Sequence, residues 1–199
     1  MTSVRSFKQK LSHVFRLWNS KHYEAALGEV EELLQAWPGN GQLYILWASL
    51  VQLQENSKHS LEDVKQALQQ ALELDKSSPA GAIELGHFLD GVEDDPQAAS
   101  KVYAEAVAQA RRLLIEGLIG QAKALLQLNK REEAMKCLLE LLHLTETASP
   151  PKRPPSERAA ADIIFRSPTG HVSKFQLNGP YATQIEDLVN EVLVNGASR

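Results

Sequence analysis

The 199-residue sequence has one cysteine, Cys137, only 6% aromatic residues and no long uncharged apolar run. A single cysteine excludes an internal disulfide, a paired-cysteine redox motif and a zinc site built from several cysteines. Basic residues interrupt the apolar residues of segment 1–18, so we expect neither a signal core nor a segment that spans a bilayer. These absences favour a protein of a reducing compartment, which we expect to be the cytoplasm.

Charge and motif content exclude several classes of function. The net charge is -4 and no run of Lys or Arg compensates for it, so we expect no binding to nucleic acid or to an anionic membrane. There is no Gly-rich phosphate loop, no nucleophile and base arrangement, and no pair of histidines spaced for zinc. Glu84 and His87 have a spacing found in di-metal carboxylate helices, but those sites need a second such motif. We therefore expect no enzymatic activity, no cofactor and no metal.

The sequence contains an internal repeat. Sets of three residues with offsets of four and seven recur after 38, 35 and 35 residues: Ala26, Val30, Leu33; Val64, Leu68, Ala71; Ala99, Tyr103, Ala106; and Ala134, Leu138, Leu141. These offsets place each set on one stripe of a helix, and a small first residue lets a neighbouring helix approach closely. The period predicts a two-helix unit with short turns.

A preceding helix is predicted for each of these stripes. Apolar spacing identifies the segments FKQKLSHVFRLWNS, GQLYILWASLVQLQ, PAGAIELGHFLD and IEGLIGQAKALLQL. Each is followed by a short polar stretch, and ENSKHS lengthens the turn of the second unit. The sequence therefore predicts four antiparallel helix pairs. Trp47 and Cys137 are expected in the core as packing residues, whereas Trp18 could be either packed or open.

Over residues 7–144 the chain resembles the tetratricopeptide repeat family. Leu85 and Gly86 match the Leu-Gly pair of that family's first helix, Ala99 and Tyr103 match its second helix, and Pro38 matches its terminal proline. No single unit carries every consensus residue. The resemblance implies a mostly α fold, a right-handed α-solenoid of about four helix pairs whose concave surface binds a segment of another protein.

In that family the ligand contacts come from the outward face of each first helix. Carried over by position, the resemblance implies a partner-binding groove formed by Phe15, Asn19, Ile45, Ser49, Gln52, Glu84, His87, Asp90, Ile119, Lys123 and Gln127. Members that clamp acidic chaperone tails need cationic or amide side chains where this chain has Glu84 and Asp90, which argues against that ligand. A basic or amphipathic segment suits the acidic middle of the groove better.

The chain changes character after Thr145. TASPPKRPPSER predicts a proline-rich linker, after which Ile163, Phe165 and Phe175 belong to two predicted strands around the turn SPTGH. A helix follows, and Gly196 ends it. We expect three parts: a helical-repeat domain at 1–144, a linker at 145–160 and a small β-hairpin with a helix at 161–199. If the hairpin leaves a free strand edge, two chains could pair there as a homodimer.

The sequence thus predicts a non-enzymatic protein-interaction module, an adaptor or an assembly factor. Two alternatives stay open. The chain could be an accessory or regulatory subunit that acts on a partner enzyme through its C-terminal hairpin and helix. It could also be a structural homo-oligomer, for which stability that depends on concentration would be the sign.

Overall fold

The computed structural model describes residues 4–146, 161–166, 172–177 and 180–194. The chain divides into two compact units, Met1–Ala110 and Arg111–Arg199. None of the described helices combines the length and the apolar composition needed to cross a bilayer.

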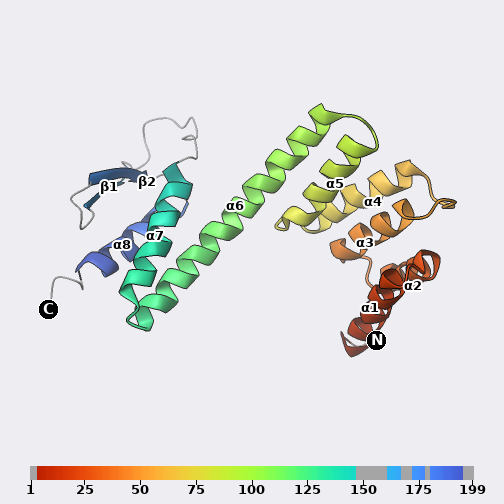
Figure 1. The fold of residues 1–199 in the computed structure, drawn as a ribbon, viewed down its shortest axis with the longest axis horizontal. Helices are drawn as coiled ribbons and strands as arrows, with labels where there is room; N and C mark the ends of the chain where they lie inside the picture. The colour runs from red at the N-terminus through yellow and green to blue at the C-terminus, as the bar shows by residue number, and fades with distance from the viewer. Residues whose placement is uncertain (1–3, 147–160, 167–171, 178–179, 195–199) are drawn as a thin grey trace. The chain divides into compact units, whose positions relative to one another are not determined.

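The first unit consists of helices that pack in chain order (Figure 1). They are α1 (Val4–Asn19), α2 (Tyr23–Ala36), α3 (Gly41–Gln52), α4 (Leu61–Leu74), α5 (Pro79–Gly91) and the first part of α6 (Pro96–Gln127). Helix α2 packs against both α1 and α3, α4 packs against both α3 and α5, and α3 also contacts α5. This arrangement is a stack of antiparallel helix pairs, in which α1, α3 and α5 are the first helices.

Side-chain caps explain where several of these helices begin. Asn40 accepts a hydrogen bond from the backbone N–H of Gln42 at the start of α3. Ser60 and Asp63 form a reciprocal capping box at the start of α4. Ser78 caps α5, whose first residue is a proline. Each cap satisfies N–H groups that have no partner inside the helix, so these turns end at defined residues.

The repeated stripes form the core. Every residue of the four predicted sets is buried except Tyr103, which is partly buried. Trp47 is also buried in the core of the first unit, which confirms its prediction as a packing residue. The second helices therefore contact their neighbours through the face that the sequence predicted.

Helix α6 corrects the prediction of four separate pairs. The second helix of the third pair and the first helix of the fourth pair are one continuous helix of 32 residues. The sequence between Val107 and Ile119 contains no proline and no Ser, Thr, Asp or Asn to cap a new helix, and it is rich in Ala, Leu and Arg, which favour helix. Gly117 is the sole helix-weakening residue there, and its cost of about 1 kcal/mol does not stop such a helix.

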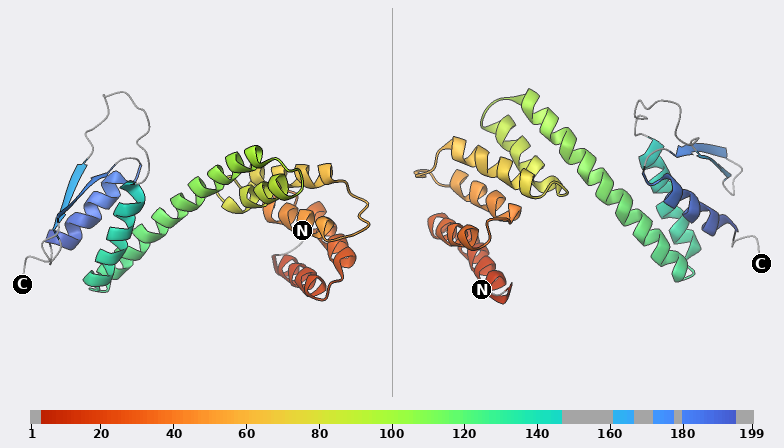
Figure 2. Two further views of the ribbon diagram at one scale, coloured as in Figure 1. Left: turned by 45° about the horizontal axis from the view of Figure 1, so that its top comes forward. Right: turned by 180° about the vertical axis from the view of Figure 1, so that it is seen from behind.

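The second unit contains the rest of α6 with α7, a two-stranded sheet and α8 (Figure 2). Its elements after α6 are α7 (Arg131–Glu146), β1 (Ala161–Arg166), β2 (Val172–Leu177) and α8 (Ala182–Val194). The strands pair antiparallel, with Ile163 opposite Phe175. Helix α7 packs against β2 and α8, and α8 contacts both strands.

Helices α6, α7 and α8 share one apolar core in this unit. Leu138 of α7, Ile185 of α8 and Ala122 of α6 are all buried in it. Cys137 is buried there as well, as expected of a packing thiol. The C-terminal helix is therefore an integral part of the second unit.

A polar contact also joins α6 to the start of α8. The Tyr181 hydroxyl donates to Glu116 Oε1 at 2.7 Å, and Arg112 Nε donates to the same oxygen at 3.1 Å. These two donors lower the pKa of Glu116, with Tyr181 as the larger cause. The hydrogen bond to Glu116 in turn raises the pKa of Tyr181.

The unit boundary differs from the predicted domain boundary at residue 144. Helix α7 belongs to the same core as α8, so the chain divides inside α6 instead of after α7. Residues 145 and 146 of the predicted linker belong to α7. The rest of that linker and the SPTGH turn lie outside the described residues.

Candidate functional site

A predominantly apolar groove of about 490 Å³ lies between α1 and α3. Its lining consists of Phe7, Leu11 and Phe15 from α1, Leu43, Ile45, Leu46 and Ser49 from α3, with Asn40 and Gln42 where α3 begins. Phe15 is 49% exposed, a large fraction for a phenylalanine. Because α1 and α3 are the first helices of successive pairs, the groove lies on the face to which the family resemblance assigns ligand contacts.

The groove brings together three residues that the sequence predicted for it, namely Phe15, Ile45 and Ser49. The prediction missed the other six lining residues, which are Phe7, Leu11, Asn40, Gln42, Leu43 and Leu46. Two of these could have been found, because Phe7 and Leu11 precede Phe15 by eight and four residues and so share its stripe on α1. The remaining predicted residues of the first two units, Asn19 and Gln52, are exposed at the ends of their helices.

Glu84, His87 and Asp90 lie on α5, which packs against α3. The Tyr103 hydroxyl of α6 lies 2.8 Å from His87 Nδ1, in hydrogen-bond contact. The pKa of Tyr103 is raised, first by its removal from water and then by the nearby carboxylates of Asp90 and Glu84. The predicted acidic residues thus lie close to one phenol, and that phenol was not predicted to be part of the site.

Gly86 allows this arrangement on α5. A Cβ atom at that position would lie 2.5 Å from the Tyr103 ring, which is closer than real Cβ contacts allow. The Leu-Gly pair that carried the family resemblance therefore has a packing reason here. The Tyr103 ring occupies the space above the glycine, and its hydroxyl reaches His87.

The predicted positions in α6 are not part of this groove. Ile119 is 5% exposed and packs in the core of the second unit, so its prediction as a partner contact is wrong. In a separate helix pair, this position of the first helix would face outward. Here Ile119 lies in the core that α6 shares with α7 and α8. Lys123 and Gln127 are exposed on α6. Their role stays a prediction.

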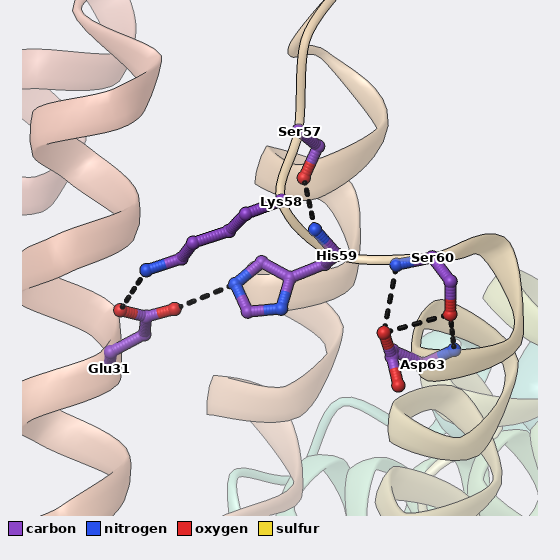
Figure 3. A network of polar contacts seen from close by, with 6 residues as sticks. All are labelled: Glu31, Ser57, Lys58, His59, Ser60 and Asp63. Carbon is purple, nitrogen blue, oxygen red and sulfur yellow. Dashed lines mark hydrogen bonds and ion pairs between the residues drawn. The ribbon is translucent and has the colours of Figure 1, made fainter.

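A second depression, of about 900 Å³, lies between the start of α2 and the segment 53–58 that follows α3. Figure 3 shows how the long turn of the second pair is held. The Glu31 carboxylate forms ion pairs with His59 Nε2 at 2.9 Å and Lys58 Nζ at 3.6 Å. His59 also packs edge-on against Trp47, with ring centroids 4.7 Å apart. These contacts bind the inserted turn to α2.

The two depressions differ in what they offer a ligand. The second one mixes charges of both signs, including Lys21, Glu24 and Glu55, so no ligand charge is favoured there. The groove between α1 and α3 offers apolar side chains with amide and hydroxyl groups at its rim. Such a lining supplies contact area and a few directional hydrogen bonds. Within the described residues, no group of three or more His, Cys, Asp or Glu is placed to hold a metal ion.

No protein family profile matches the chain, and no curated protein sequence matches it. It is similar to a solved structure of MamA, from residue 41 to the end, from Desulfovibrio magneticus RS-1. The TM-score is 0.47 and the identity 24%, over 53% of this chain and 57% of that structure. Two further MamA structures have TM-scores of 0.43 and 0.40, at 14% and 15% identity. They match 69% and 65% of this chain, and 72% of each MamA chain is covered.

Proposed function

We propose that this protein is a non-enzymatic protein-interaction module, an adaptor or an assembly factor, that binds a segment of a partner protein between α1 and α3. The observation that carries the proposal is the apolar groove whose wall includes the half-exposed Phe15. Exposed aromatic side chains beside an apolar depression are typical anchors of protein interfaces. The resemblance to the tetratricopeptide repeat family, in which first helices contact the ligand, supports the same face.

The size of the groove limits how much binding free energy it can supply, so it determines how many further contacts a partner needs. A volume of about 490 Å³ accommodates more than one side chain of the size of leucine or phenylalanine. Burying two such anchors contributes about 3–6 kcal/mol. Association costs about 4–15 kcal/mol in lost translational and rotational freedom. A stable complex therefore needs further contacts along the same face, which α3 and α5 offer.

The proposal is tested by blocking the groove with a large side chain. Ser49 lines it, and Ser49→Trp would place an indole where the partner's anchors are proposed to bind. Random peptides of about 15 residues, long enough to cross both helices, would be displayed and selected on the full chain. We expect selected peptides to lose at least about tenfold in affinity for S49W, a change of about 1.4 kcal/mol.

The matched control is Ser100→Trp, because Ser100 is exposed on α6 outside the groove. Circular dichroism would establish that both variants are folded. Selected peptides should bind S100W as they bind the original chain. Equal binding to S49W and S100W, or no selected peptide at all, would refute the proposal.

A second candidate function is a homodimer formed through the C-terminal sheet. Within the described residues that sheet has two strands, β1 and β2, which pair only with each other. Each strand therefore has an outer edge that another strand could join. The mass of the full chain in solution, measured by light scattering across a concentration series, tests this candidate. A monomeric mass throughout the series would exclude it.

A further inference from the structure

The first helices of the first unit differ in charge. Helix α1 has Lys8 and Arg16 in a shallow depression beside the groove, together with Gln9 and Ser12. Helix α5 has Glu84 and Asp90, both close enough to Tyr103 to raise the pKa of its phenol. Among the residues that the structure describes, no basic side chain forms an ion pair with either of these two carboxylates.

The order of these charges along the groove follows from the packing. Helix α3 forms the groove with α1 on one side and packs against α5 on the other. A segment that leaves the apolar groove across α3 therefore comes next to α5, the helix that carries Glu84 and Asp90. In the opposite direction it comes to the basic side chains of α1.

We infer that the groove selects a partner segment in which apolar anchor residues are followed, on the α5 side, by one or more Lys or Arg residues that pair with Glu84 and Asp90. This inference rests on the proposed function. The apolar anchors supply contact area between α1 and α3, and the basic residues supply the additional contacts that those anchors require.

Charge complementarity of this kind decides between partners more than it adds affinity. Asp90 is exposed and Glu84 is partly exposed, so each ion pair is modest and is weakened by salt. An acidic residue in the same place would be repelled by both carboxylates, while Lys8 would repel a basic residue at the other end. This face therefore distinguishes a segment from another segment whose charges are in the opposite order.

The experiment compares peptide selection on two variants with the same net charge. Glu84→Lys with Asp90→Lys reverses the acidic pair on α5. Glu73→Lys with Glu105→Lys makes the same change of net charge at exposed positions on α4 and α6. The probe is the displayed random peptide library used for the groove, with the full chain as the target.

We expect peptides selected on the original chain to combine large apolar residues with Lys or Arg. The E84K/D90K variant should weaken their binding about tenfold at low salt, and the loss should shrink in high salt. The E73K/E105K variant should change their affinity by less than about twofold. Selection on E84K/D90K should no longer enrich basic residues.

Four results would overturn the inference. Apolar peptides without basic enrichment, still blocked by S49W, would leave the proposed function standing and refute the charge selection. Equal losses in the two charge variants would assign the effect to net charge alone. A dimer of the full chain that S49W dissociates would identify a second copy as the occupant. Selection of no peptides would refute both the inference and the proposed function.

Discussion

Leu138→Ala tests whether α7 and α8 form one core in the second unit. Leu138 is 1% exposed and belongs to the cluster that contains Ile185 and Leu188 of α8. The substitution removes buried apolar atoms and leaves a cavity that helices on both sides cannot fully close. Comparable leucine truncations cost about 2–5 kcal/mol, and this nearly inaccessible site should lie near 3–4 kcal/mol. For a chain of this size the melting temperature would fall by roughly 6–16 °C.

The assay is urea unfolding of the full chain followed by far-ultraviolet circular dichroism. Leu128→Ala is the matched control, because Leu128 lies just after α6 in the same unit and is 67% exposed. The control should change the free energy of unfolding by less than about 0.5 kcal/mol. If L138A and L128A unfold at the same urea concentration with the same slope, the buried contact between α7 and α8 does not exist.

Three other substitutions test separate parts of the fold. Ile185→Ala should destabilise the second unit by about 2–5 kcal/mol in the same urea assay, and a near-neutral effect would separate α8 from that core. Ser60→Ala should cost about 1 kcal/mol by removing the cap of α4. The Ser60 backbone N–H, and to a smaller extent the Ser60 hydroxyl, lower the pKa of Asp63, so this carboxylate stabilises the fold above its ordinary pKa and ceases to do so as the pH falls through its lowered value. S60A removes only the hydroxyl, the smaller of these two causes, so it should reduce the loss of stability on acidification without abolishing it. A larger loss of stability on acidification in S60A would contradict the capping box. Gly86→Ala should displace the Tyr103 ring and destabilise the first unit by about 1–3 kcal/mol. Replacing Tyr103 by alanine should remove that penalty, and a penalty that persists would exclude the contact as its cause.

The predictable part of the fold was the repeated stripe. Ala26, Val64 and Ala134 follow a spacing that only a helix places on one face, and burial of that face is the main source of its stability. The prediction needed no knowledge of the neighbouring helices. The structure confirms each of these positions as buried.

The continuous α6 could not be predicted from the period alone. A repeat indicates where helices recur, but the turn between them depends on residues that interrupt the helix. Between Val107 and Ile119 such residues are absent, and reading that segment for caps would have indicated one helix. The error at Ile119 followed from predicting a separate fourth helix pair, because the outward face of its first helix was assigned by analogy with the other pairs. Ile119 belongs to a core that includes residues of α8, which is far along the chain.

The groove was predicted in part. Phe15, Ile45 and Ser49 were placed by the family resemblance, and the structure brings them to one depression. The contact between Tyr103 and His87 joins residues on different helices, and no local spacing indicates such a pair. The ion pairs that Glu31 makes with the long turn were missed for the same reason.

Site-specific photo-crosslinking in cells of the native host tests most directly the proposal that the groove between α1 and α3 binds a partner. A benzophenone amino acid would replace Phe15 in the groove, or Leu61 at the start of α4, which is 58% exposed and does not line the groove. We expect a discrete protein adduct from position 15 that is absent at position 61 and disappears when Ser49→Trp fills the groove. Adducts of equal yield at both positions, or an adduct at position 15 that S49W leaves unchanged, would contradict it.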